Sequence, residues 1–424
     1  MKIAIIGSGI SGLTCANYLH QEHQITIFEA NDYVGGHTAT VDVEVESGTY
    51  AIDTGFIVYN DKTYPNFIRL LDELGLQGRP TQMSFSVHND KNGLEYNGHT
   101  IATLFAQKRN IFNPKFYGFI KEILRFNQLA KKVDIDDVAE QDVTLGDFLK
   151  AYQFSDYFCE NYILPMGAAI WSSSMSDMRG FPLTFFVRFF DHHGLLNVAD
   201  RPQWRVIPGG SREYIRKMLP KLSAQIRLNC PVYTVSRGLH GVLVRSQDGD
   251  EQFDQVIFCC HSDQALQMLE DPSKDEVELL SKIPYRDNEV VLHTDTSLLP
   301  KARVAWASWN YWLPNEFGAE HALPSVTYNM NILQGIQSPE TFCVTLNKTE
   351  AIQEDKILRK FHYSHPVFTA EGLSARKQKH LIQGVNKTWF AGAYWYNGFH
   401  EDGVRSALDV VMDIINQQAL RQAI

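Results

Sequence analysis

The chain has 424 residues, of which 44% are hydrophobic and 21% are charged, so it can bury a core divided between two domains. Its 49 acidic and 39 basic residues give a formal net charge of −10, which excludes the broad cationic surface that nucleic-acid binding requires. We therefore expect a soluble globular protein that has no nucleic-acid partner.

The N-terminal residues predict a strand, a tight turn and a helix. The apolar run 3–6 leads into G-x-G-x-x-G at Gly7, Gly9 and Gly12, and a helical pattern that includes Ser11 follows. In a dinucleotide-binding unit the first glycine permits the turn, the second admits the pyrophosphate, and the third allows helix and strand to pack closely. This pattern predicts a doubly wound nucleotide domain.

A second β-rich run, 25–28, ends at Glu29. In a dinucleotide fold this position reaches the adenosine ribose, where a carboxylate accepts hydroxyl hydrogen bonds. The strand, the glycines, the helix and the acid are in register, so the segment predicts nucleotide binding, although it does not separate NAD from FAD.

The next segments favour FAD. "NDYVGGHTATV" contains Gly35 and Gly36, which would let a loop pass close to a ligand, and "YAIDTGFIVYN" contains Gly55. This arrangement resembles the extended FAD motif of the flavin amine oxidase and phytoene desaturase superfamily. His37 stands where that superfamily usually has arginine, so the arginine contact is not carried over.

Two later segments match the order in which this superfamily returns to its cofactor. After the glycine pair in "VIPGGSREYIRKML", a run of strands implies a backbone contact to the adenine near Val232. "KTWFAGAYWYNGFHEDGVRSALDVVMDII" then predicts a strand, a loop and a helix whose positive N-terminus would favour charge on a reduced flavin. The resemblance implies FAD contacts at Gly392, Gly403 and Val404.

Several stretches, among them "LFAQKRNIFNP", "ILPMGAAIWSSS" and "HHGLLNVADRPQW", resemble the flavoprotein segment fused to plant cyclopropane fatty acid synthases and its free-standing bacterial relatives. The landmarks extend over about the whole chain. The resemblance implies an FAD-dependent oxidoreductase that dehydrogenates or reduces carbon–carbon bonds of an unsaturated or modified fatty acyl lipid. The alternatives are a flavin-containing partner subunit of a lipid methyltransferase without redox turnover, and a genuine amine oxidase.

Departures from amine oxidases bear on the reaction. Those enzymes commonly carry a lysine near the flavin, whereas the corresponding stretch "IPYRDNEVVLHTD" has Asn288 and Glu289. The two-aromatic cage of that family would fall on Tyr396 and Phe399. No cysteine lies in that loop, so we expect FAD to be bound non-covalently.

The three flavin segments define the expected domains. We assign 1–76, 205–272 and 384–424 to a discontinuous FAD-binding domain of the amine oxidase type, and 77–204 with 273–383 to an α+β substrate domain.

Within the substrate domain, the helix predicted from "FYGFIKEILRFNQLAKKV" is amphipathic and basic, which suits either a peripheral membrane contact or a core-facing helix. His193, of the pair His192–His193, and Trp171 are candidates for the substrate pocket, and no metal site is expected.

Neither a secretory signal nor an apolar run of membrane-spanning length is seen. The six cysteines lack metal-ligand spacing. We therefore expect a cytoplasmic enzyme.

Overall fold

The computed structural model describes residues 1–135, 143–198, 200–316, 318 and 321–422. Its centre is a five-stranded parallel sheet in which each neighbouring pair is in register. In spatial order the strands are β10 (Ala224–Arg227), β2 (Gln24–Phe28), β1 (Lys2–Ile6), β14 (Gln255–Phe258) and β20 (Thr388–Phe390). This is the doubly wound architecture that the N-terminal pattern predicts.

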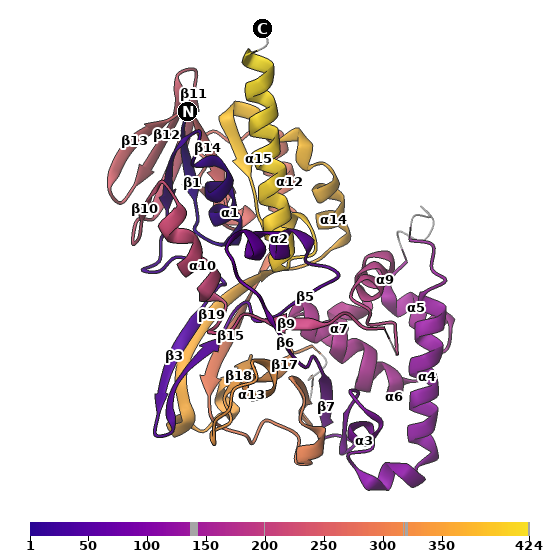
Figure 1. Ribbon diagram of the computed structural model, residues 1–424. Helices are drawn as coiled ribbons and strands as arrows, with labels where there is room; N and C mark the ends of the chain where they lie inside the picture. Colours follow the sequence, from indigo (N-terminus) through magenta and orange to yellow (C-terminus); the bar gives the residue numbers. More distant parts are fainter. Residues whose placement is uncertain (136–142, 199, 317, 319–320, 423–424) are drawn as a thin grey trace.

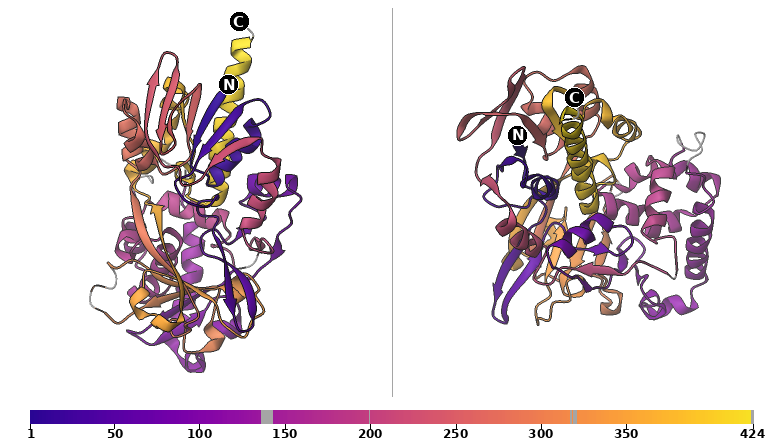
Figure 2. Two further views of the ribbon diagram at one scale, coloured as in Figure 1. Left: turned by 90° about the vertical axis from the view of Figure 1, so that its left-hand side faces the viewer. Right: turned by 45° about the horizontal axis from the view of Figure 1, so that its top comes forward.

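Alternation along β1 sends side chains to both faces of this sheet. Ile3 and Ile5 pack beneath four helices, and Ala4 and Ile6 pack on the other side. The four helices are α1 (Ile10–Leu19), α2 (Pro65–Glu73), α10 (Arg212–Met218) and α15 (His400–Gln422). Figures 1 and 2 show α15 running from the middle of the molecule to the end where both termini lie.

The opposite face of the parallel sheet is covered by a three-stranded antiparallel sheet and further helices. The strands are β11 (Val232–Gly238), β12 (Gly241–Ser246) and β13 (Gly249–Phe253). The helices are α11 (Ser262–Met268), α12 (Lys274–Ser281) and α14 (Ala370–Lys377).

The positions of α12 and α14 differ from the expected domain division. Leu279 and Leu280 of α12, with Ala375 of α14, join the core beside the parallel sheet. The predicted domain boundaries, after residue 272 and before residue 384, place both helices in the substrate domain, whereas the structure packs them against the FAD-binding domain. Their sequences predict helices but do not specify the surface against which each helix packs.

A seven-stranded mixed sheet forms the base of the second half of the molecule (Figure 1). It combines both insertions, since β7 and β8 come from the first and the other five strands from the second. In order the strands are β19 (Ile357–Pro366), β15 (Tyr285–His293), β18 (Cys343–Leu346), β17 (Ser325–Asn329), β16 (Trp309–Leu313), β7 (Phe85–Asn89) and β8 (Leu94–Asn97).

Smaller elements connect the halves. They are β3 (Thr40–Val45) with β4 (Gly48–Asp53), the three-stranded sheet of β5 (Tyr59–Asn60), β9 (Trp204–Val206) and β6 (Arg79–Pro80), and the short helices α3 (Ile101–Leu104) and α13 (Met330–Leu333).

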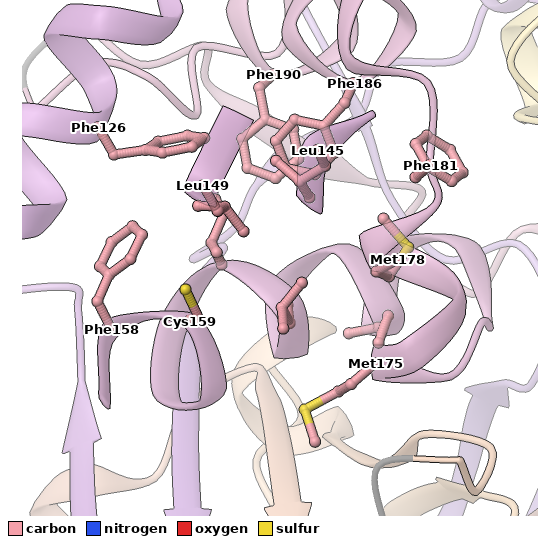
Figure 3. Packing of buried hydrophobic residues seen from close by; sticks show 14 of the residues in the cluster. Phe126, Leu145, Leu149, Phe158, Cys159, Met175, Met178, Phe181, Phe186 and Phe190 are labelled. Carbon is pink, nitrogen blue, oxygen red and sulfur yellow. The ribbon is translucent and has the colours of Figure 1, made fainter. Parts of the chain in front are cut away.

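A helical layer packs beside the seven-stranded sheet, and aromatic side chains fill its interior (Figure 3). Phe116, Phe119 and Phe126 of α4 are buried in this core, so the face of α4 that carries them is core-facing. The helices are α4 (Pro114–Ala130), α5 (Leu145–Ala151), α6 (Asp156–Phe158), α7 (Leu164–Trp171), α8 (Met175–Arg179) and α9 (Leu183–His192).

Among the described residues, no helix combines the length and the apolarity needed to cross a bilayer.

Candidate functional site

The turn between β1 and α1 is held closed by two of its three glycines. Gly7 has a φ of +103°, and a Cβ there would lie 2.8 Å from the Cys259 carbonyl oxygen. A Cβ on Gly12 would lie 2.0 Å from the Gly7 carbonyl oxygen. At Gly9, by contrast, no described atom outside the adjacent residues comes within 4 Å of such a Cβ. The turn therefore leaves open space above Gly9, at the start of α1, where a helix binds a phosphate group.

Glu29 is buried at the end of β2 and is tied to this turn. Its Oε2 accepts hydrogen bonds from the Ser8 backbone N–H at 3.0 Å and from Ser8 Oγ at 2.6 Å. Its Oε1 accepts from the Asn31 backbone N–H at 2.9 Å and from Asn31 Nδ2 at 3.0 Å. The carboxylate thus shapes the phosphate turn, a role that the sequence pattern did not indicate, and the ribose contact stays a prediction.

We expect Glu29→Ala to weaken FAD binding by about tenfold to a few hundredfold, because charge-assisted hydrogen bonds typically contribute about 1.5–3 kcal/mol. Flavin retained after dialysis measures the effect. Asp32→Ala, which removes an exposed carboxylate three residues further on, is the matched control and should retain flavin. Equal retention in both variants would remove Glu29 from the site.

The Gly-Gly loop lies against the same turn. The Gly35 N–H donates to Ser8 Oγ at 3.2 Å, and a Cβ on Gly36 would lie 3.3 Å from the Gly9 Cα. Gly55 packs on the backbone of His37, whose carbonyl oxygen would be 2.2 Å from a Cβ at that glycine. The start of β11 is also close, since the Cys230 N–H donates to the Glu29 carbonyl at 2.9 Å and Val232 follows two residues later.

The start of α15 is the last of the segments that meet at the turn between β1 and α1. Ser11 Oγ donates to the Gly403 carbonyl at 3.0 Å, and the Gly392 N–H donates to Ser406 Oγ at 3.0 Å. Val404 is buried in the core. A Cβ on Gly403 would lie 2.6 Å from Ile10 Cγ2, so this glycine is required by the packing of α15 on α1. Segments separated by almost 400 residues thus meet at one turn.

Three histidines from separate segments of the chain have their rings close together. The His37 ring lies 5.6 Å from that of His365 and 6.4 Å from that of His261, measured between centroids. Burial, with a smaller contribution from the two neighbouring histidines, lowers the pKa of His37 to about 3. Its Nε2 is buried without a hydrogen-bond partner in the described part of the chain.

Arg376 of α14 is a buried cation that, like His37, has side-chain nitrogen without a hydrogen-bond partner among the described residues. None of its three guanidinium nitrogens has a hydrogen-bond partner among the residues that the structure describes. Its guanidinium packs on the Phe368 ring at 4.2 Å, and burial lowers its pKa to about 10, which leaves it charged at neutral pH. Asp402, in the first turn of α15, acts on it electrostatically.

These features fit FAD. The space above Gly9 accommodates a pyrophosphate at a helix start, and buried polar groups on His37 and Arg376 require partners that a cofactor or its substrate would supply. Gly7, Gly9, Gly12, the Gly35–Gly36 loop and the start of α15 would hold the cofactor.

His400, the first residue of α15, is close enough to His37 for the two imidazoles to act on each other electrostatically. Its ring stacks on Phe56 with centroids 3.7 Å apart, and its Nε2 lies 3.1 Å from the Tyr214 hydroxyl. That hydroxyl lies 2.5 Å from Thr38 Oγ1. Burial lowers the pKa of His400 to about 3, so the folded protein keeps this imidazole neutral.

This depressed pKa makes stability dependent on pH. Below pH 6.5 the unfolded chain gains a proton at His400 that the folded chain does not take up until about pH 3. The contribution of His400 to the free energy of unfolding is therefore fully present above pH 6.5 and decreases as the pH falls below it. Between pH 7 and pH 5 the loss is about 2 kcal/mol for this residue. His400→Gln should reduce the difference in unfolding free energy between these pH values by that amount, and urea unfolding measures it. His362→Gln, at an exposed position on β19, should retain the wild-type difference.

The expected aromatic cage of Tyr396 and Phe399 is not formed. Tyr396 hydrogen-bonds through its hydroxyl to Lys379 Nζ at 2.7 Å and to Asp409 Oδ2 at 2.5 Å, and its ring packs in the core beside the parallel sheet. Phe399 instead packs on Phe189 of α9, with centroids 5.0 Å apart. The turn between these two residues, in which Gly398 has a φ of +88°, directs the two rings to different cores.

His193 lies beside Phe399, with ring centroids 5.9 Å apart. Its Nδ1 donates to the Phe189 carbonyl at 2.9 Å, which leaves Nε2 as the acceptor, and burial lowers its pKa to about 4. Trp171 lies deeper. Trp171 is therefore a core residue and not a pocket wall. The five phenylalanines that enclose its ring are Phe181, Phe185, Phe186, Phe189 and Phe190.

The stretch in which amine oxidases carry a lysine has a buried amide, Asn288. Asn288 Oδ1 accepts from Asn347 Nδ2 at 2.8 Å, and its own Nδ2 lies 3.4 Å from His365 Nδ1. Ser172 Oγ lies 3.0 Å from the same histidine nitrogen. In the described ranges, no three His, Cys, Asp or Glu side chains are arranged to hold a metal ion.

The fold and this site define a flavin-dependent oxidoreductase. Residues 10–316, more than half of the chain, match the family described as flavin containing amine oxidoreductase, and the chain belongs to that family. Its cofactor is FAD.

Named relatives agree with this assignment. The chain is 24% identical over 333 residues to AofH of Mycobacterium tuberculosis, which carries the name of a flavin-containing monoamine oxidase, covering 76% of this chain and 68% of the relative. The CLA-producing fatty acid isomerase from P. acnes superposes with a TM-score of 0.70 at 16% identity, covering 97% and 98% of the two chains. Cyclohexylamine oxidase from Brevibacterium oxydans gives 0.69 at 16% identity and covers 99% of each. The two structural likenesses show the fold alone.

Proposed function

We propose that this FAD-dependent oxidoreductase dehydrogenates or reduces a carbon–carbon bond in an unsaturated or modified fatty acyl lipid. The proposal rests on the side chains that lie against the Phe399 ring. The rings against it belong to Phe189 and to a histidine that burial keeps neutral, and these surfaces suit an uncharged hydrocarbon chain.

The stretch that holds a lysine in amine oxidases supports the same substrate class. Here Asn288 uses its side chain to hold Asn347 and to contact His365, so the lysine that amine oxidases carry near the flavin has no counterpart at this position. The shared fold of the fatty acid isomerase from P. acnes is compatible with an acyl substrate.

FAD, when bound, would supply the acceptor or donor of a hydride. The chain itself must bind and orient the acyl chain and exclude water. Removal of two hydrogens from adjacent carbons also releases a proton, and His193 Nε2 is the acceptor beside Phe399 to which we assign it. Reduction would use the reverse transfer from the same nitrogen.

Amine oxidation is the second candidate, because the relative AofH bears that name. A role as partner of a lipid methyltransferase stays a prediction.

Anaerobic titration of the oxidised enzyme distinguishes the candidates. Saturated and unsaturated acyl phospholipids form one arm, and short primary amines form the other. We expect acyl lipids to bleach the flavin or, for pre-reduced enzyme, to restore its colour. Bleaching by amines alone would establish amine oxidation and contradict the proposal. A flavin that exchanges electrons with neither arm nor with NAD(P)H would favour the non-redox partner.

A further inference from the structure

The end of the molecule formed by α3 and the start of α4 exposes large apolar side chains. Phe112 is 88% exposed and Ile101 is 80% exposed. Ile111, Tyr117 and Val304 are also exposed. We call this set, with the basic residues named below, the apolar tip. Figure 1 shows α3 at the opposite end of the molecule from the two termini.

The apolar tip is held in place by its own packing. The Phe105 ring packs on Phe116 and Tyr117, with centroids 5.4 and 5.8 Å apart. The Tyr117 hydroxyl donates to the Ile111 carbonyl at 3.0 Å. The helical turn 303–305, which carries Val304, contacts α3. Since the exposed side chains stand on a supported backbone, their exposure is a property of the folded surface.

Charge distinguishes the tip from the rest of the chain. Residues 96–121 and 296–315 contain no aspartate or glutamate, although the chain has 49 such residues and a net charge of −10. The two segments contribute six cations, Lys108, Arg109, Lys115, Lys121, Lys301 and Arg303.

Three acids that precede these segments in the sequence accept hydrogen bonds within the protein. Glu95 is buried and accepts hydrogen bonds from the Lys301 and Ala302 backbone N–H groups at 3.1 and 2.9 Å. Asp295 is buried and accepts from the Ser297 N–H at 2.9 Å. Asp90, after β7, accepts from Trp312 Nε1 at 2.8 Å. The surface around Phe112 is therefore cationic and apolar together.

We propose that the apolar tip docks the protein on an anionic lipid bilayer. Phe112 and Ile101 would enter the boundary between headgroups and acyl chains while the surrounding lysines and arginines contact lipid phosphates. An acidic protein or a nucleic acid would match the cations, but it would leave the exposed phenylalanine and isoleucine without a partner. This inference does not depend on the proposed reaction, because it concerns a surface outside the flavin site.

Co-sedimentation of the FAD-loaded protein with vesicles tests the proposal. Vesicles of phosphatidylcholine alone are compared with vesicles that also contain phosphatidylglycerol, at low and high salt. We expect binding to the anionic vesicles, weakened by salt, and little binding to the neutral ones. Removing two cations in Lys108→Gln/Lys301→Gln should weaken binding about twenty-fivefold, at about fivefold per basic residue.

Ile101→Ser/Phe112→Ser should weaken binding at least tenfold without altering flavin content. Leu239→Ser, at a leucine that is 94% exposed in the β11–β12 turn, and Lys377→Gln on α14 are the matched controls and should bind as wild type does. Absence of binding to anionic vesicles at low salt, or equal binding by tip and control variants, would overturn the proposal. Because retained flavin and acyl turnover are measured separately, failure here is distinct from failure of the proposed reaction.

Discussion

Gly12→Val is expected to yield a protein that is destabilised by more than about 4 kcal/mol and that retains no flavin. A Cβ at this position lies 2.0 Å from the Gly7 carbonyl oxygen, which is backbone in a turn fixed on both sides. The clash is relieved only if α1 moves off β1. Thermal unfolding and the flavin content of the purified protein measure both effects.

Gly9→Ala is the matched control, because it separates binding from folding. Gly9 has an extended backbone with φ −64° and ψ −179°, a conformation open to any residue, and a Cβ there meets no described atom within 4 Å beyond the adjacent residues. Flavin-free Gly9→Ala should therefore unfold within about 0.5 kcal/mol of wild type. Its FAD affinity should fall at least tenfold, since the methyl group occupies the pyrophosphate space. Wild-type affinity in Gly9→Ala would place the pyrophosphate elsewhere.

Gly403→Val is expected to destabilise the protein by about 3 kcal/mol and to lower its flavin content, because overpacking at a tight contact forces neighbours apart. The added Cβ would approach Ile10 Cγ2 to 2.6 Å and Ser11 Oγ to 3.1 Å. The effect acts through the α1–α15 contact that assembles the flavin segments.

The double variant Ile10→Ala/Gly403→Val tests this cause. Removing the Ile10 methyl groups makes room for valine, so part of the lost stability and flavin content should return. If the double variant is as deficient as Gly403→Val while Ile10→Ala alone is near wild type, the clash with Ile10 is not the cause. Chemical unfolding of the four proteins gives the coupling free energy.

The nucleotide-binding half was predictable because its signals are local. Gly7, Gly9 and Gly12 follow one strand and open one helix, and Glu29 ends the next strand, so their arrangement follows from strand and helix geometry. The closing helix, which the C-terminal segment predicts after a strand and a loop, is present as α15.

The groups that give the site its electrostatic character were not predictable in the same way. His37, His261 and His365 lie on three segments that only the packing of two sheets brings together, and no spacing rule connects them. Arg376 reads as an ordinary basic residue near a helix end, but the packing of α14 buries it. Tyr396 was misplaced because the turn through Gly398 gives its ring a different direction from that of Phe399.

The most direct test of the central claim is a single-turnover reaction of the FAD-loaded enzyme with acyl lipids under anaerobic conditions, with flavin absorbance and acyl mass followed together. We predict that one acyl chain changes by two hydrogens for each flavin that changes oxidation state. Turnover of a simple amine, with no two-hydrogen change in any acyl chain, would contradict the account.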